Sequence, residues 1–462
     1  MKEKRGQWNS RLGFILAAAG SAVGLGNIWK FPGKVGANGG GAFLLTYMIV
    51  VAIIGFTVMM AEFAIGRKTH KNAVGAFAML NKKWKFAGVI GIVALFIILS
   101  YYAVVGGWVT KYVITYLTGA QFGNGSNAYA TYFTNFITSP VEPILWDLLF
   151  LGVCIFIISK GVSAGIEKVS KVLMPGLFVL LIGIAIRSVT FPGADEGLRF
   201  MFTFRLEDLT SDMIVAAVGQ AFFSLSVGMG ILITYGSYLD KETDMVNSAK
   251  WICILDTFVA ILAALAIIPS VFVTVGPDGL GMGGGFAFVA LPHVFETLPG
   301  GIGHIFGLVF FVLLLLAALT SALSILESLV ACVSEEFHIS RKKSMAIMVI
   351  PLTLLSCGYS LSQLSTRGIN LPWFDFSNGF QMLAMNAVME KLTDNVLIPL
   401  GALAFCIFVG WVWKPKNAIA EIELEGVTFP LKKAWSFSIR YIASIAIIVI
   451  LYFTVVKGIV LS

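Results

Sequence analysis

Three polar features interrupt the apolar segments of this sequence, and their residue types are those that bind cations. The run Gly20–Asn27 holds three glycines and a serine, and Asp256 lies a few residues inside another apolar segment. The hydroxyls of Thr320 and Ser321 follow a long apolar run in a third. Carboxylate, carbonyl and hydroxyl oxygens are hard ligands that suit a hard cation. Plainer interpretations stay open, because Asp256 could extend to the aqueous interface and helix hydroxyls often bond to the preceding turn.

The glycines of the first feature are unfavourable in an unbroken membrane helix. Each costs about 1 kcal/mol relative to alanine in a helix interior, and unpaired backbone groups find no water in hydrocarbon. The composition is favourable if the helix is broken there, so that amides of its second half face an anion and carbonyls of its first half face a cation. We therefore predict a broken helix at this run.

The overall composition is that of an all-α polytopic membrane protein. The 462 residues are 58% hydrophobic and 12% charged, whereas soluble proteins carry about 25% charged residues. Eleven apolar segments are long enough to span a bilayer: 12–35, 41–66, 87–117, 143–160, 167–187, 212–238, 251–275, 304–333, 344–360, 383–413 and 438–457. A cleavable signal peptide is the alternative for the first segment, but the composition of its break recurs downstream.

The charge distribution predicts orientation and not nucleic-acid binding. Most basic residues fall on alternate loops, which places the N-terminus in the cytoplasm and, with eleven spans, the C-terminus outside the cell. The five cysteines lie within or at the ends of apolar segments, so we expect no disulfide framework. The segment Gly281–Gly301 is too short to span and too apolar for water, and we expect a re-entrant or capping hairpin there.

An internal repeat relates the first and sixth segments. Val23–Gly26 recurs as Val227–Gly230, each with a serine upstream, Ser21 and Ser226. Five spans separate the copies, so the second crosses the membrane in the opposite direction. This pattern predicts two inverted five-helix repeats with a substrate site between their broken helices. The repeats would comprise residues 1–190 and 191–413, followed by a cytoplasmic loop and an eleventh helix in 414–462.

Several longer motifs resemble those of bacterial amino-acid transporters in the neurotransmitter:sodium symporter family. They occur in that family's order along essentially the whole chain: Trp8, Arg11–Gly13, Gly20–Pro32, Asn38–Phe43, Glu62–Arg67, Gly219–Ser226, Ala317–Ser321 and Asn395–Gly401. The resemblance implies a LeuT-like fold in which helices 1 and 6 are unwound.

The resemblance also implies two Na⁺ sites. The first would take oxygens from the substrate carboxylate and from Ala22, Asn27, Ser224 and Asp256. The second would take oxygens from Gly20, Val23, Ala317, Thr320 and Ser321. Each ion or substrate would then neutralise a charge that the other would otherwise face alone.

The family's substrate site carries over to twelve positions of this sequence: Ala22, Gly24, Leu25, Gly26, Ile98, Tyr102, Phe223, Ser224, Ser226, Met229, Ser321 and Ile325. By resemblance, the Tyr102 hydroxyl and the amides of Leu25 and Gly26 bind the substrate carboxylate, and Phe223 closes over the substrate. From the residues alone, Tyr102 could equally be a packing aromatic. Glu62 and Gln220 would support the unwound segments.

Two pairs of charged residues correspond to the family's gates. Arg5 and Glu335 match the cytoplasmic pair, and Lys30 and Glu390 match the outer pair, with Asp375 as the alternative carboxylate. Lysine cannot form the bidentate fork that arginine makes with a carboxylate. We therefore expect a looser or water-bridged outer gate.

These observations predict a sodium-coupled symporter that imports hydrophobic L-amino acids, aromatic and large aliphatic ones, through the plasma membrane without covalent chemistry. Eukaryotic relatives bind chloride through residues matched here by Tyr47, Gln220 and Ser224, but the remaining position is Ala260. Since Asp256 supplies the missing negative charge, we expect chloride-independent transport. We expect a monomer or a homodimer. The rival classes are an intramembrane enzyme, for which no nucleophile–base spacing is found, and a channel, for which the polar residues line no single face.

Overall fold

The structure is a computed structural model that describes residues 7–120, 122–123, 127–274, 276, 286–296, 302–364, 368–376 and 379–458. Within them, nine helices are long and apolar enough to cross a membrane, or ten if one bent pair is counted as a span. The first four of the nine comprise α3 (Gly41–Val50) with η2 (Val51–Gly55) and α4 (Phe56–Thr69), η3 (Lys82–Trp84) with α6 (Lys85–Thr118), α8 (Glu142–Ser159), and η4 (Val162–Glu167) with α9 (Lys168–Val189). The other five comprise α13 (Met245–Thr274), α15 (Gly303–Glu336), α16 (Arg341–Leu361), α17 (Met385–Lys391) with η10 (Leu392–Leu397), α18 (Ile398–Ile407) and η11 (Phe408–Val412), and α20 (Lys432–Phe437) with η13 (Ser438–Ile442), α21 (Ala443–Leu451) and η14 (Tyr452–Val456).

The bent pair confirms the predicted break in the first segment. Helix α1 (Arg11–Ala22) ends at the glycine run, and the chain continues as η1 (Gly26–Lys30) and α2 (Phe31–Ala37) at an angle of 53° to it. The last carbonyls of α1 and the first amides of η1 therefore lie at the bend without the partners that a continuous helix would supply.

The sixth apolar segment is broken in the same way. Helix α11 (Ser211–Ser224) and helix α12 (Ile231–Gly236) are separated by a non-helical stretch in which Ser226, Gly228 and Gly230 have positive φ angles of 54°, 84° and 82°. Only glycine adopts such angles without cost, which explains the glycines of the repeated motif. Each half of this segment is shorter than a membrane span, so the count of eleven spans and the inverted repeat stay predictions.

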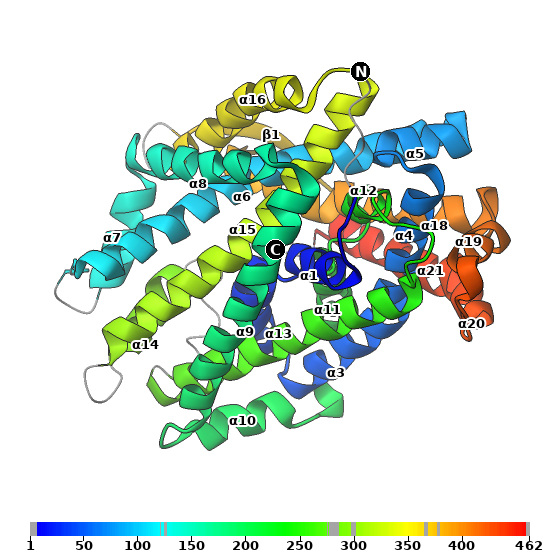
Figure 1. The fold of residues 1–462 in the computed structure, drawn as a ribbon. Helices are drawn as coiled ribbons and strands as arrows, with labels where there is room; N and C mark the ends of the chain where they lie inside the picture. Colours follow the sequence, from blue (N-terminus) through cyan, green and yellow to red (C-terminus); the bar gives the residue numbers. More distant parts are fainter. Residues whose placement is uncertain are drawn as a thin grey trace.

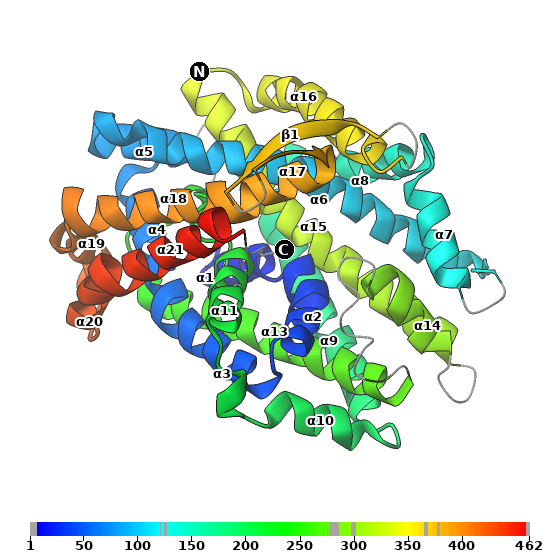
Figure 2. The same cartoon turned by 180° about the vertical axis from the view of Figure 1, so that it is seen from behind.

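The two broken helices lie in the middle of the bundle. Helix α1 packs against α9, α13 and α15, and it is central in both Figure 1 and Figure 2. Helix α21 packs along α18 at one side of the molecule. Outward-facing positions carry apolar side chains, such as Val172 and Val179, which are each 69% exposed. An apolar outer surface around a packed interior is expected of a protein whose solvent is lipid.

The segments between the spans form short elements: α5 (Ala73–Leu80), α7 (Ala128–Ile137), α10 (Ala194–Phe202), η5 (Leu206–Asp208), η8 (Phe286–Ala290), α14 (Leu291–Glu296), α19 (Pro415–Ile422) and η12 (Leu424–Gly426). Of these, η8 and α14 lie in the segment for which we expected a capping hairpin. They cover only part of it, because 281–285 and 297–301 lie outside the described residues.

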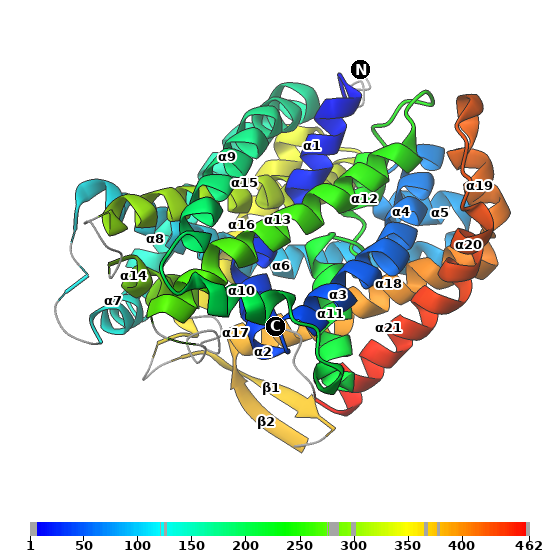
Figure 3. The same cartoon turned by 90° about the horizontal axis from the view of Figure 1, so that it is seen from below.

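One feature was not predicted. Strands β1 (Asn370–Asp375) and β2 (Gly379–Ala384) form an antiparallel hairpin in which Phe374 pairs with Phe380. Figure 3 shows this hairpin projecting from one end of the helical body, opposite the end at which α1 begins. We call these the hairpin side and the amino-terminal side.

Candidate functional site

A cavity of about 400 Å³ lies where the two broken helices meet. Its lining includes all twelve residues that the sequence predicted for the substrate site, and in addition Ser21, Asn27 and Ile231. These residues come from both breaks and from the middles of α6 and α15. The structure therefore brings together side chains that are up to about 300 positions apart in the sequence.

One end of the cavity is polar because the first break exposes backbone amides to it. The amide of Leu25 donates a hydrogen bond of 3.3 Å to the Tyr102 hydroxyl, and Tyr102 is 6% exposed. Gly24 leaves room for this contact, since a Cβ atom there would lie 2.6 Å from the Ser321 oxygen and 3.1 Å from the Tyr102 oxygen. A buried hydroxyl beside helix-terminal amides is suited to binding an anion such as a carboxylate.

The first predicted cation cluster surrounds the carboxylate of Asp256, which is fully buried. Asn27 Nδ2 donates to Oδ1 at 2.7 Å, the Ser224 hydroxyl donates at 2.9 Å, and the Tyr47 hydroxyl donates to Oδ2 at 3.0 Å. All three partners are uncharged, so the cluster keeps the negative charge of the carboxylate. A buried charge is costly unless it is paired, and these oxygens are of the type that pairs with a hard cation.

The second cluster joins α15 to the last turn of α1. The Ser321 hydroxyl lies 3.3 Å from the carbonyl oxygen of Gly20 and 3.1 Å from that of Ser21. The neighbouring Thr320 hydroxyl lies 3.0 Å from the carbonyl of Ala317. Val23 stands at the end of α1, where its amide bonds to Ala19 at 2.7 Å. Hydroxyl and carbonyl oxygens from two helices therefore meet next to the break.

Two buried polar side chains support the breaks as predicted. Gln220 Nε2 donates to the carbonyl of Gly26 at 3.2 Å, and the Glu62 carboxyl accepts the amide of Gly228 at 2.6 Å. Backbone groups that leave a helix inside a membrane protein need such partners. Both side chains thus stabilise the unwound conformations that form the cavity.

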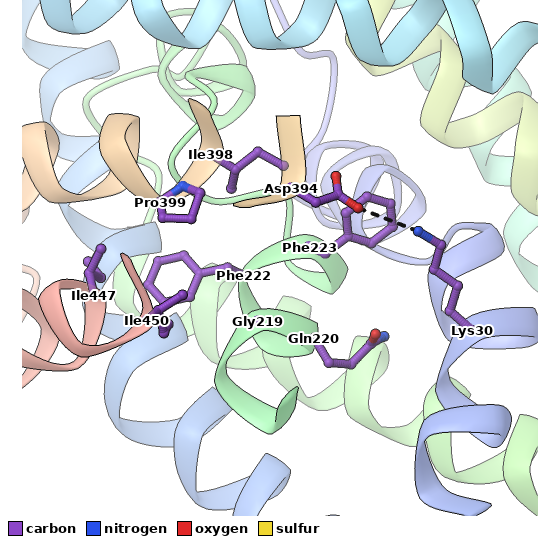
Figure 4. A pocket seen from close by; sticks show the side chains of 10 residues that line it. All are labelled: Lys30, Gly219, Gln220, Phe222, Phe223, Asp394, Ile398, Pro399, Ile447 and Ile450. Carbon is purple, nitrogen blue, oxygen red and sulfur yellow. Dashed lines mark ion pairs between the residues drawn. The ribbon is translucent and has the colours of Figure 1, made fainter. Parts of the chain in front are cut away.

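On the hairpin side, the structure differs from the predicted gate. The Lys30 ammonium lies 3.6 Å from Asp394 Oδ2, whereas Glu390 accepts a hydrogen bond of 2.7 Å from the Tyr359 hydroxyl. Figure 4 shows the Lys30–Asp394 ion pair over the ring of Phe223, and the ammonium is 4.8 Å from that ring centre. The carboxylate in this pair is thus Asp394, one helical turn after Glu390. The sequence signal that could have identified Asp394 is its charge inside an apolar segment.

A second cavity of about 450 Å³ adjoins this ion pair. Lys30, Gln220 and Asp394 line one end, as Figure 4 shows, and apolar side chains of α11, α18 and α21 line the other. No residue pattern predicted this cavity, because its walls come from helices distant in the chain.

On the amino-terminal side, Glu335 accepts hydrogen bonds of 2.9 Å from the backbone and side chain of Asn72. Its predicted partner Arg5 lies outside the described residues. A further ion pair was missed: Glu327 binds Arg341 through two bonds of 2.8 and 2.6 Å and accepts the Tyr238 hydroxyl at 2.7 Å.

Comparison with known proteins agrees with this architecture. The family model described as the sodium:neurotransmitter symporter family matches residues 5–134 and 139–461. The sodium-dependent transporter YhdH of Bacillus subtilis is 37% identical over 97% of both chains. The sodium- and chloride-dependent GABA transporter 2 of Homo sapiens is 26% identical over 91% of this chain and 75% of its own. The crystal structure of MhsT in complex with L-phenylalanine superimposes with a TM-score of 0.86, at 42% identity, over 96% of this chain and 99% of that one.

Proposed function

The chain belongs to the sodium:neurotransmitter symporter family, and on this premise we propose that it imports hydrophobic L-amino acids together with two Na⁺ ions. The observation that carries the proposal is the position of the cavity, which lies between both helix breaks and touches both oxygen clusters. The N-terminus would be cytoplasmic and the C-terminus extracellular, with two inverted five-helix halves in 1–190 and 191–413 and an eleventh helix in 414–462.

The two oxygen clusters would each hold one Na⁺. One ion would bind Asp256 and Asn27 and also contact the substrate carboxylate, which Tyr102 and the amides of the first break would hold. The other would bind between Thr320, Ser321 and the last turn of α1. Because Asn27 and Ser321 also line the cavity, each ligand would complete the site of another. That shared wall would supply the coupling between ion and substrate.

We further propose that transport is independent of chloride. The human relative is named as sodium- and chloride-dependent, whereas this chain places the fixed charge of Asp256 among Asn27, Tyr47 and Ser224. A fixed carboxylate would balance the sodium charge that chloride would otherwise balance.

The walls of the cavity favour an apolar side chain. Ile98, Met229 and Ile325 line it beside Phe223 and the hydroxyls of Ser226 and Ser321. This lining offers no partner for a charged side chain, whose burial would be costly. Glycines on both sides of the flexible Met229 would let the second break adapt to large side chains. Aromatic and large aliphatic amino acids would therefore bind, and glycine would bind poorly.

Alternating access requires a barrier on each side of the cavity. The Lys30–Asp394 pair lies on the hairpin side and would form the outer gate. On the amino-terminal side, the Glu327–Arg341 pair and Glu335, with Arg5 as its partner, would form the cytoplasmic gate. Opening one gate while the other is closed would carry substrate and ions across.

The test is uptake of labelled leucine into proteoliposomes that contain the purified protein. Uptake should require an inward Na⁺ gradient, be electrogenic, and be inhibited by unlabelled tryptophan, tyrosine, phenylalanine and isoleucine. Sodium-independent flux or flux that does not saturate would contradict a symporter.

Two variants test the proposed specificity. Met229→Phe fills the adaptable break, and Gly230→Ala puts a Cβ atom at a φ of 82°, 2.7 Å from the Cβ of Ala73. We expect both to weaken tryptophan competition by about tenfold more than leucine binding, since overpacking is costly. If tryptophan fails to compete in the wild type, or competes equally in both variants, the role assigned to this segment is wrong.

A further inference from the structure

The last helical segment makes a hydrogen bond to the helix that carries the outer-gate carboxylate. The hydroxyl of Thr454, in η14, donates to the carbonyl oxygen of Asn395 at 3.0 Å, and Thr454 is 3% exposed. Asn395 lies in η10, a π-helical stretch between α17 and α18. The bond therefore joins two helices, whereas hydroxyls in membrane helices usually bond within their own.

A proline lies four residues after Asn395. Pro399 has no N–H group, and a proline in a helix displaces the carbonyl one turn before it. The Thr454 hydroxyl binds this carbonyl at the point where the helix departs from α geometry.

The residue next to Asn395 is the gate carboxylate. Asp394 Oδ1 lies 3.2 Å from the Thr393 hydroxyl and 3.5 Å from the Tyr101 hydroxyl, and Oδ2 lies 3.6 Å from Lys30. The position of the Asn395 peptide thus helps determine where Asp394 points. Lys30 in turn lies over Phe223, which lines the substrate cavity.

We propose that Thr454 is a positioning residue for the outer gate: it fixes the irregular backbone at Asn395, and thereby holds Asp394 against Lys30. The helix that lies outside both five-helix halves then controls how firmly the cavity is closed. This inference rests on the proposed function, because it takes the Lys30–Asp394 pair as the barrier above a bound amino acid.

The test is the rate at which labelled leucine dissociates from the purified protein in saturating NaCl. Thr454→Val keeps the shape of the side chain and removes the donor, and it should speed dissociation by about five- to tenfold, the effect of one lost buried hydrogen bond. Thr454→Ser keeps the donor and should remain within about twofold of the wild type. The matched control is Thr46→Val, since the half-buried Thr46 hydroxyl bonds at 2.9 Å to Ala42 in its own helix.

A second background tests the route of the effect. If Thr454 acts through the carboxylate, Thr454→Val should add less than about twofold to the dissociation rate of Asp394→Asn. Multiplicative effects of the two substitutions would overturn the proposal, as would equal rates in the wild type and Thr454→Val.

Hydrogen–deuterium exchange separates this inference from the proposed function, because it needs no ligand. In Thr454→Val, the backbone amides of residues 392–401 should exchange faster than in the wild type, and those of α11 should exchange at the same rate. If the wild type binds no amino acid in sodium, the proposed function fails, while faster exchange in this segment still supports the positioning role. Unchanged exchange there overturns it.

Discussion

Asp256 is the residue on which the electrical balance of the site depends. Its carboxylate is fully buried and is bound by an amide and two hydroxyls, so no positively charged side chain is among these partners. If a cation pairs with this carboxylate, removing the buried negative charge should weaken cation binding far more than removing an exposed charge would. The effect of neutralising it is therefore a direct test of whether a cation binds there.

We predict that Asp256→Asn lowers the affinity for Na⁺ by about tenfold, or about 1.4 kcal/mol, or creates a requirement for chloride. The amide keeps the size and one oxygen ligand but loses the charge. The measurement is leucine uptake as a function of sodium concentration in chloride and in gluconate buffers. Asp195→Asn is the control, because that side chain is 72% exposed. Wild-type uptake that stops in gluconate would contradict chloride independence.

The identity of the carboxylate in the proposed outer gate gives a second prediction at this scale. Asp394→Asn should speed leucine dissociation by about tenfold, and Glu390→Gln by less than about threefold, because Lys30 contacts Asp394 and Glu390 contacts Tyr359. Both substitutions remove one negative charge and nearly conserve shape. Dissociation that is faster in Glu390→Gln would restore the pairing expected from the sequence.

Residue types alone predicted which residues line the cavity better than they predicted which charged residues contact each other. Glycines, hydroxyls and a carboxylate inside apolar segments mark a binding site because each is unfavourable there without a ligand. The pairing of Lys30 with Asp394 depends on the irregular turn of η10 between α17 and α18. A shift of one helical turn in the choice of carboxylate is the error to expect when that irregularity is invisible in the sequence.

The two broken helices are the elements that create the cavity, and their glycines serve two purposes. Gly228 and Gly230 adopt positive φ angles, whereas Gly24 is required for space beside Ser321 and Tyr102. The breaks were predictable because glycine is costly in a membrane helix. The β hairpin was not, since β1 and β2 are short and their exposed face is apolar like the spans around them, with Phe380 82% exposed.

We predict that Gly24→Ala reduces leucine binding by more than about tenfold. Its Cβ atom would lie 2.6 Å from the Ser321 oxygen and 3.1 Å from the Tyr102 oxygen, so the hydroxyl that we propose binds the substrate carboxylate would have to move. Equilibrium binding in saturating sodium measures the loss. Gly152→Ala is the control, because nothing lies within 4 Å of its Cβ position. Since alanine favours helix over glycine by about 1 kcal/mol, weaker binding in Gly24→Ala would not reflect a loss of helix propensity.

At the scale of the whole molecule, an ion pair lies on each side of the cavity. On the hairpin side, Lys30 contacts Asp394 through one pair of atoms, at 3.6 Å. The amino-terminal side has the two-bond contact between Glu327, which is fully buried, and Arg341, which is 28% exposed. Two parallel charge-assisted bonds are stronger than one. The ion pair on the amino-terminal side is therefore the stronger of the two.

We predict that Arg341→Met lowers the free energy of unfolding by about 3 kcal/mol, because it leaves the Glu327 carboxylate buried without its partner. The double variant Glu327→Gln with Arg341→Met should recover at least half of that loss, since no buried charge then remains unpaired. Denaturation of the purified protein in mixed micelles measures both. Lys343→Met is the control from the same helix, at an exposed position. A double variant less stable than Arg341→Met would show that the carboxylate stabilises the fold without its partner.

The shared wall between the substrate cavity and the two oxygen clusters has a consequence for how this protein can evolve. Ser224 and Ser321 both line the cavity, and their hydroxyls reach Asp256 and Gly20 respectively. If the clusters bind Na⁺ as we propose, a mutation at either serine that admitted a new substrate would alter ion binding in the same step, and selection would then act on both properties at once. Substitutions that change the substrate specificity of this protein's descendants should therefore accumulate at positions that line only the cavity, such as Ile98, Met229 and Ile325. The two serines should stay unchanged.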